Sequence, residues 1–249
     1  NLLMPFTFCH PAIILPLAKI SRSKLSATGL IIGSMSPDFE YFLKMRMEKT
    51  HGHTLGGLFY LDLPLTIILA FAFHLLVRDA LILNLPELLK KRLLPFVELD
   101  WMSWVKKKWY VLVYSALIGI FSHIFWDAFT HTNGYFVTHI SYLQGSTEVF
   151  GVVIRKADLG QLLSSVFGGL FILLVLLWPL KQEITTYAIR RKIAYWILII
   201  LIMGLIVLMR NVQSIGDFIA TSISGGLIGL LVTPTIMKWI NIKSHEKPI

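Results

Sequence analysis

Five long apolar stretches constrain what this chain can fold into. They cover residues 58–77, 109–129, 162–180, 193–209 and 215–237, and each approaches the ~20 residues that an α-helix needs to cross the hydrocarbon core of a bilayer. Of the 249 residues, 55% are hydrophobic and only 15% are charged, which is too apolar for a soluble domain of this length. The sequence therefore predicts an all-α fold: a multi-pass integral membrane helical bundle with about five spanning helices.

Two shorter apolar stretches precede the first span. Residues 12–18, interrupted by Pro16, and residues 25–35 are each about half as long as a span requires. We therefore expect a re-entrant pair or two short helices on the periphery of the bundle.

The segments between the spans carry most of the charge. Residues 78–108 are expected to form a basic loop, and residues 130–161 a loop of mixed character. Because the sequence has no internal repeat and no low-complexity tract, we predict one integral membrane domain over residues 1–249. It comprises an N-terminal motif segment (1–57), core metal-site helices (58–137) and C-terminal helices (138–249).

The basic residues indicate a membrane orientation. Residues 78–108, 181–192 and the C-terminal tail carry seven, four and three Lys or Arg, whereas residues 130–161 carry two. The positive-inside rule makes the first set cytoplasmic and residues 130–161 external, although the six Lys or Arg of residues 1–57 oppose this orientation. Basic residues that keep loops on the cytoplasmic side and contact anionic lipid head groups also explain the net charge of +9. We therefore expect membrane lipids and no nucleic acid as partners.

A polar stripe lies at the end of the second span. His123, Asp127 and His131 follow one another at i, i+4 and i+8, so on a helix they are rotated by only about 40° and 80° and share one face. Ionisable groups at membrane depth are costly unless they have partners. A metal ion is the partner that best suits two imidazoles and a carboxylate.

Further polar groups fall on the same side of the predicted membrane. Imidazole and carboxylate donors without thiolate suit a divalent metal, Zn²⁺ first with Mn²⁺ or Fe²⁺ as alternatives. A catalytic zinc needs about three protein ligands, so there are enough candidates for one or two ions. The only cysteine, Cys9, rules out a cysteine-rich site and an internal disulfide. The candidates are His10, Asp38, Glu40, His51, His53, Asp62, His123, Asp127, His131 and His139.

Several of these residues also have structural explanations. His123 and Asp127 can form an isolated hydrogen-bonded pair, and Asp38 can cap the helix that follows it. Glu40 can be a surface acid. His51 and His53 cannot share one helix face, and His53 is preferred because it leads directly into the first span.

Four sequence blocks resemble a known family. The blocks MPFTFCHPA (4–12), GSMSPDFEYF (33–42), HTLGGLF (53–59) and SHIFWDAFTH (122–131) resemble a bacterial family of membrane proteins catalogued as domain-of-unknown-function family 4184. The pattern is also similar to that of the LexA-regulated inner-membrane metal-dependent hydrolases and, more distantly, to the zinc-dependent phospholipase C group. The resemblance implies a hydrolase whose metal ligands are His10, Asp38, His53, His123, Asp127 and His131.

These observations lead to two hypotheses. The first is a hydrolase of the bacterial cytoplasmic (inner) membrane that cleaves a phosphate ester of a lipid or lipid-like substrate through metal-activated water. Asp38, or Glu40 as second choice, would act as general base. Arg155, Lys156 or Arg46 would bind the substrate phosphate. The alternative is a non-catalytic metal-binding or transporting bundle, which requires polar groups on both sides of the midplane.

Overall fold

The computed structural model describes residues 7–20, 24–48, 52, 54–97, 99–177 and 189–240. The first half of the chain forms η1 (Thr7–Cys9), α1 (Pro11–Ile20), α2 (Ala27–Gly33), η2 (Ser36–Asp38), α3 (Phe39–Lys44), α4 (Leu55–Gly57), η3 (Leu58–Asp62), α5 (Leu63–Ala72), η4 (Phe73–Val77), α6 (Arg78–Asn84), α7 (Glu87–Leu93) and η5 (Leu94–Phe96). The second half forms α8 (Trp101–Thr130), α9 (Tyr135–His139), α10 (Ser141–Gln144), β1 (Ser146–Val149), β2 (Val152–Arg155), α11 (Lys156–Leu177), α12 (Ile189–Met209) and α13 (Ile215–Trp239).

Among the described residues, five helical segments are long and apolar enough to cross a membrane. They run over Leu58–Asn84, Trp101–His139, Lys156–Leu177, Ile189–Met209 and Ile215–Trp239. The prediction of an all-α, multi-pass membrane bundle is therefore confirmed, with one small antiparallel hairpin of β1 and β2 added to it. The two N-terminal apolar stretches form the short helices α1 and α2, and Pro16 lies inside α1 without ending it.

Two predicted loops were wrong. Residues 78–108 form α6, α7, η5 and the start of α8, and residues 130–161 contain α9, α10, the hairpin and the first turns of α11. The charges of the first segment predict a loop, but Lys and Arg are good helix formers and extend helices readily. Lys90 in α7 is fully buried.

The chain forms two compact units, and each takes in three segments. The first unit comprises Asn1–Phe39, Thr50–Ile67 and Lys108–Val175; the second comprises Glu40–Lys49, Ile68–Lys107 and Leu176–Ile249. Within α8 the backbone leaves helical geometry at Lys108 (φ −132°, ψ 34°), where one unit passes into the other. Each unit contains segments from both halves of the chain, so the units do not correspond to successive domains. The single membrane domain over residues 1–249 stays a prediction.

In the first unit, glycines allow α2 to pack directly on the backbone of α8. A Cβ atom on Gly33 would lie 2.5 Å from the carbonyl oxygen of Ala116, and one on Gly119 would lie 2.4 Å from that of Leu30. Such close backbone approach is typical of small-residue contacts between membrane helices. The Ser26 backbone N–H donates to Ser115 Oγ at 2.9 Å, which fixes the start of α2 on the same helix.

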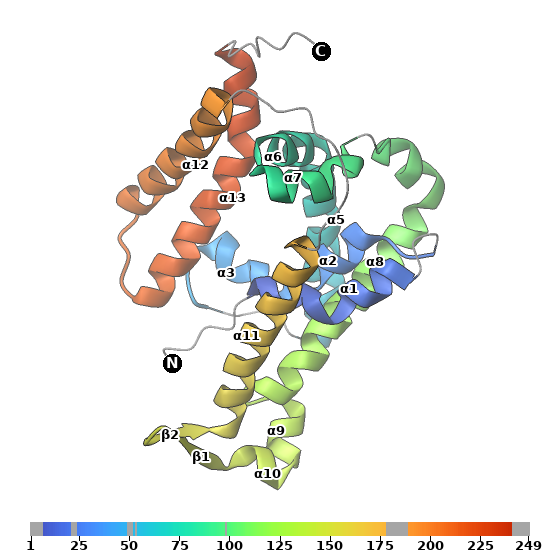
Figure 1. Ribbon diagram of the computed structural model, residues 1–249. Coiled ribbons are helices and arrows are strands. Elements are labelled where there is room, and N and C mark those ends of the chain that lie inside the picture. Colours follow the sequence, from blue (N-terminus) through green and yellow to red (C-terminus); the bar gives the residue numbers. More distant parts are fainter. Residues whose placement is uncertain are drawn as a thin grey trace. The chain divides into compact units, whose positions relative to one another are not determined.

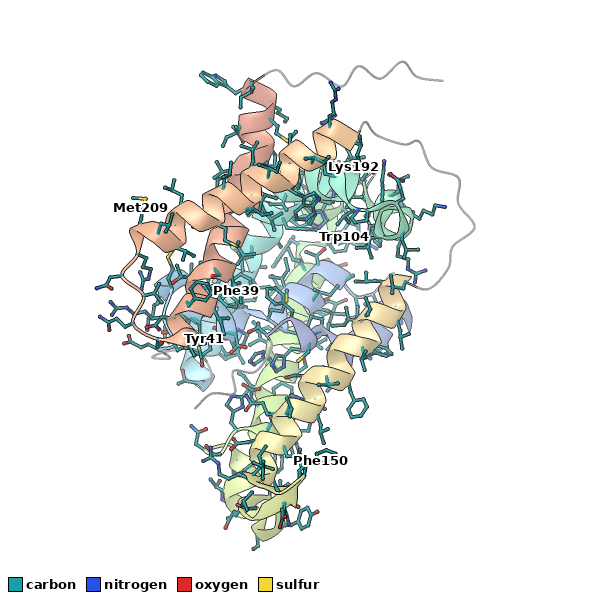
Figure 2. The ribbon with its side chains drawn as sticks, turned by 60° about the vertical axis from the view of Figure 1, so that its left-hand side comes forward. Phe39, Tyr41, Trp104, Phe150, Lys192 and Met209 are labelled. Carbon is teal, nitrogen blue, oxygen red and sulfur yellow. The ribbon has the colours of Figure 1, made fainter. Side chains whose placement is uncertain are left out.

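In the second unit, α12 and α13 lie side by side (Figure 1). Cβ atoms on Gly225 and Gly229 of α13 would lie 2.9 Å from Met203 Cα and 3.1 Å from Ile199 Cγ2 of α12, so these glycines permit the contact. Lys192 lies near the start of α12 and Met209 at its end (Figure 2); Lys192 is buried, and its ammonium group pairs with Glu87.

Candidate metal centre

The C-terminal part of α8 supplies one side of the cluster. His123 is fully buried, Asp127 is nearly so, and the His131 side chain is 23% exposed. His123 Nε2 lies 3.3 Å from Asp127 Oδ2, and His131 Nδ1 lies 3.4 Å from Asp127 Oδ1. The predicted stripe is therefore one continuous set of donor atoms, with Asp127 between the two imidazoles.

The N-terminus supplies a second imidazole beside the first. His10 lies between η1 and α1 and is buried. Its Nε2 is 3.7 Å from Asp127 Oδ1, and its ring stacks on that of His123 with centroids 3.9 Å apart. Residues 113 positions apart in the chain (123 − 10) thus place imidazole nitrogens against the same carboxylate.

Asp38 adds a second carboxylate. It ends the turn η2, which Pro37 helps to form, and it is fully buried. Its Oδ1 lies 3.6 Å from His123 Nε2, while its Oδ2 accepts a hydrogen bond of 2.8 Å from Thr7 Oγ1. The hydroxyl of Thr7 thereby fixes which oxygen of Asp38 faces His123.

The ring of His123 is oriented by the end of α2. Its Nδ1 lies 2.8 Å from the carbonyl oxygen of Ser34. A carbonyl oxygen can only accept, so Nδ1 carries the proton and donates it. Nε2 is therefore the nitrogen that faces Asp38 and Asp127, in the arrangement by which a backbone carbonyl orients a metal-binding histidine.

The separations of these atoms fit a metal ion. Donor atoms of His10, His123 and Asp127 all lie within 4.8 Å of one another. The nitrogen–oxygen distances of 3.3–3.7 Å exceed the ~2.7–3.2 Å of a good hydrogen bond. The shortest of them, 3.3 Å between His123 Nε2 and Asp127 Oδ2, equals the roughly 3.3–3.4 Å that separates two ligands each ~2.0–2.1 Å from a tetrahedral Zn²⁺, and the other two are longer. Buried imidazole and carboxylate donors without thiolate are also the chemistry such an ion prefers.

Cys9 lies next to His10 but does not alter this donor set. Burial raises the pKa of the Cys9 thiol above its usual range, so the neutral thiol predominates there. Its Sγ is 3.9 Å from Ser165 Oγ of α11.

The chain was compared with known proteins. Residues 4–235 match the family described as "Domain of unknown function (DUF4184)". The chain belongs to this family. Searches of curated proteins and of solved structures find no match. The family membership predicted from four sequence blocks is thus confirmed, and similarity to the inner-membrane hydrolases stays a prediction.

In this family member the structure brings together most of the predicted site residues. His10, Asp38, His123, Asp127 and His131 converge in the first unit. His51 and His53 lie outside the described residues, so the choice between them stays a prediction.

Three other candidates are placed differently. Glu40 belongs to the second unit, where its Oε1 lies 2.7 Å from Lys44 Nζ, and its role as general base stays a prediction. Asp62 is fully buried in the π-helical turn η3, which packs against η2, the turn that carries Asp38. His139 is exposed and its Nδ1 bonds to the Tyr135 carbonyl at 2.7 Å.

Sequence reasoning missed Thr7 and Ser34, which hold Asp38 and His123 in place. Both residues lie inside blocks 4–12 and 33–42, so the block pattern was the available signal. Their partners are 31 and 89 residues away, which is why no local spacing identified them.

Proposed function

We propose that this protein is a membrane-embedded, metal-dependent hydrolase that acts on a phosphate ester of a lipid or lipid-like substrate. One observation carries the proposal. Buried imidazole and carboxylate groups from three separate segments of the chain converge at ligand-to-ligand distances. Buried charged groups in proteins are paired with one another or coordinate metal ions.

The residues that would hold the ion follow from this geometry. His10, His123 and Asp127 form the central set, and Asp38 and His131 extend it. His53 completes the proposed ligands on the basis of the resemblance. The set suits one or two ions, with Zn²⁺ as the first choice and Mn²⁺ or Fe²⁺ as alternatives. When bound, the ion supplies Lewis-acid activation of water and charge neutralisation.

Asp38 is the proposed general base. Thr7 donates to its Oδ2, and its Oδ1 faces His123, so Oδ1 is the oxygen proposed to accept a proton from water. Asp127 lies between His10, His123 and His131, so its proposed role is to position the three imidazoles and not to transfer protons. Glu40 remains the second choice of base.

The substrate class follows from location and resemblance. The cluster lies on a helix long and apolar enough to cross a membrane, which favours an amphiphile that enters from the bilayer. The phosphate ester comes from the resemblance of the ligand pattern to known hydrolases. His131 is the most exposed group of the cluster and marks its accessible side.

We further propose that the protein resides in a bacterial cytoplasmic membrane with the cluster on the external face. The positive-inside rule supports this orientation, because residues 130–161 carry few basic residues. The bacterial source rests on the family resemblance alone.

Elemental analysis of detergent-purified protein tests the proposal. Wild type is compared with His123→Ala, Asp127→Ala and the control His139→Ala, which removes an exposed imidazole outside the cluster. We expect a transition metal near stoichiometry in wild type and control, and its loss in both cluster variants. Wild type loaded with metal should then hydrolyse members of a panel of phospholipids and lipid-carrier phosphates.

Two other results would change the conclusion. If wild type holds no metal even after reconstitution with Zn²⁺, Mn²⁺ or Fe²⁺, the cluster is a hydrogen-bonded network and the hydrolase proposal fails. If metal is bound, no panel member is cleaved and proteoliposomes pass the ion, the transporting alternative is correct.

A further inference from the structure

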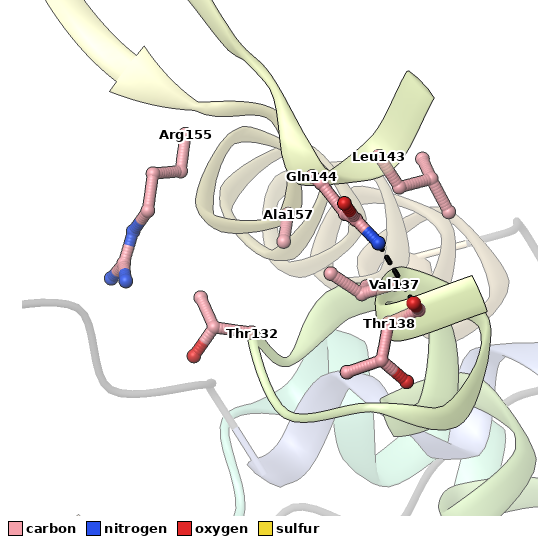
Figure 3. Close-up of a pocket in the computed structure, with 7 residues that line it drawn as sticks. All are labelled: Thr132, Val137, Thr138, Leu143, Gln144, Arg155 and Ala157. Carbon is pink, nitrogen blue, oxygen red and sulfur yellow. Dashed lines mark hydrogen bonds between the residues drawn. The ribbon is translucent and has the colours of Figure 1, made fainter. Parts of the chain in front are cut away.

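A pocket lies in the first unit, close in sequence to the cluster residue His131. It is a pocket of about 370 Å³ formed between the end of α8, the α9–α10 segment and the start of α11 (Figure 3). Its lining begins with Thr132, the residue after His131. The residues that line it are Thr132, Val137, Thr138, Leu143, Gln144, Arg155 and Ala157.

The walls of this pocket are fixed to the helix that carries the cluster. The His131 carbonyl accepts from the Gly134 N–H at 2.8 Å, and a Cβ on Gly134 would lie 2.5 Å from the Ala128 carbonyl oxygen. The turn therefore folds tightly onto the end of α8. On the opposite wall, the Lys156 N–H donates to the Gly145 carbonyl at 2.9 Å and closes the hairpin against α11.

Arg155 is the basic residue that lines the pocket. Its Nε donates to Asp158 Oδ2 at 2.6 Å, and this contact holds the guanidinium group in place. Within the described part of the chain, its two terminal nitrogens have no hydrogen-bond partner. Arg155 and Thr132 lie on one side of the pocket, across from Gln144 and Thr138 (Figure 3). Two parallel N–H donors of this kind match a pair of phosphate or carboxylate oxygens.

The structure also distinguishes Arg155 from the two other cations considered for phosphate binding. Lys156 Nζ sits 3.5 Å from the centroid of the Tyr142 ring, so its charge is directed at the ring face. Arg46 belongs to the second unit. Among the three, Arg155 is the one that lines a pocket.

Exposed apolar side chains surround this region. Phe150 at the tip of the hairpin is completely exposed (labelled in Figure 2). Val152, Val153 and Tyr142 are each more than half exposed. In a segment that joins two membrane spans, such side chains are typical of the interface where lipid head groups lie.

We propose that Arg155, together with Thr132, binds a phosphate group on the head of an amphiphile. The inference rests on the proposed function, since the phosphate would belong to the amphiphile proposed there as the substrate. Arg155 binds the phosphate through its terminal N–H groups, the Thr132 hydroxyl adds a donor, and the exposed apolar side chains of the hairpin contact the lipid portion.

Binding measurements on the full-length, metal-free protein in detergent micelles test this inference. The probes are dihexanoyl phosphatidic acid and inorganic phosphate, followed by ³¹P NMR or calorimetry. We expect Arg155→Gln to weaken binding about tenfold or more, because hydrogen bonds to charged groups are the stronger ones. Arg155→Lys should fall between wild type and Arg155→Gln, since it keeps the charge and loses the paired donors.

Lys156→Gln is the matched control, because it removes the same charge one residue further along. We expect binding to change less than about twofold, since the Lys156 ammonium lies over the Tyr142 ring and Lys156 does not line the pocket. If Arg155→Gln binds phosphatidic acid like wild type, or if Lys156→Gln loses as much, the inference is wrong. Tighter binding of phosphatidic acid than of inorganic phosphate identifies a lipid as the source of the phosphate; equal binding identifies the free anion.

The outcome is separable from that of the proposed hydrolase. If His123→Ala keeps Arg155-dependent binding while wild type holds no metal, the hydrolase proposal fails and the phosphate site stands. If metal and hydrolysis are present but Arg155→Gln leaves KM unchanged, the phosphate site alone fails.

Discussion

The carboxylate of Asp38 accepts a hydrogen bond from the Thr7 hydroxyl group, and this makes Thr7 a sensitive position. Thr7 Oγ1 donates to Asp38 Oδ2 across 31 residues of sequence, in a fully buried environment. Removing a group that hydrogen-bonds to a metal ligand typically lowers the affinity for the metal by about 10–100-fold.

We therefore expect Thr7→Val, which keeps the shape and removes the hydroxyl, to lower metal affinity by about 10-fold or more. The measurement is a competition titration against a chelator of known affinity. Thr233→Val is the control, because Thr233 is equally buried in α13 of the second unit. Unchanged affinity in Thr7→Val would show that Asp38 does not contribute to the ion's binding.

At the scale of elements, α2 and α8 act as one structural piece. Their glycines bring the two backbones into contact, and the end of α2 then places the Ser34 carbonyl 2.8 Å from His123 Nδ1. The close packing of α2 on α8 therefore also orients the imidazole ring of His123.

A single methyl group between these helices should disturb both. A Cβ on Gly119 would lie 2.4 Å from a backbone oxygen, whereas one on Gly169 of α11 would meet nothing within 4 Å. Overpacking of this kind costs about 1–3 kcal/mol, although alanine otherwise favours a helix by ~1 kcal/mol over glycine. We expect Gly119→Ala to lower Tm and metal content, and Gly169→Ala to leave Tm unchanged or raise it. Equal behaviour in thermal unfolding and elemental analysis would contradict this packing.

At the scale of the whole molecule, metal binding and folding of the first unit should be linked. The cluster joins η1, η2 and α8, which are distant in the chain. A ligand present at about 100 times its Kd stabilises a folded protein by ~2.7 kcal/mol.

Chelation should therefore lower the Tm of wild type and leave that of His123→Ala unchanged. Thermal unfolding with and without chelator, in the same detergent, provides the measurement. A shift of equal size in both proteins would mean that the chelator acts elsewhere.

Orientation in the membrane is a second property of the whole molecule. Glu148 and Lys107 are exposed near opposite ends of the span Trp101–His139. In a Cys9→Ser background, Glu148→Cys should react with an impermeant thiol reagent from the external side, and Lys107→Cys only after permeabilisation. The reverse labelling pattern would place the cluster on the cytoplasmic face.

The sequence by itself was enough for the spans and for the polar stripe. Both are local properties: about 20 successive apolar residues commit a segment to cross a bilayer, and i, i+4 spacing commits side chains to one helix face. His123, Asp127 and His131 could therefore be placed together from their positions alone. The segment 78–108 was misjudged because charge is only an indirect sign of a loop.

Only the tertiary structure decided what meets the stripe. The ring of His10 stacks on that of His123, and the Ser34 carbonyl accepts a hydrogen bond from His123 Nδ1. The Thr7 hydroxyl orients the carboxylate of Asp38. The tertiary structure also places Arg155 in the lining of a pocket and the Lys156 ammonium over the Tyr142 ring, which no local sequence pattern indicates. The contacts at the cluster join residues tens of positions apart. The contact of Ser34 with His123 also accompanies the close approach of two helix backbones that Gly33 and Gly119 permit, which no periodicity in the sequence records.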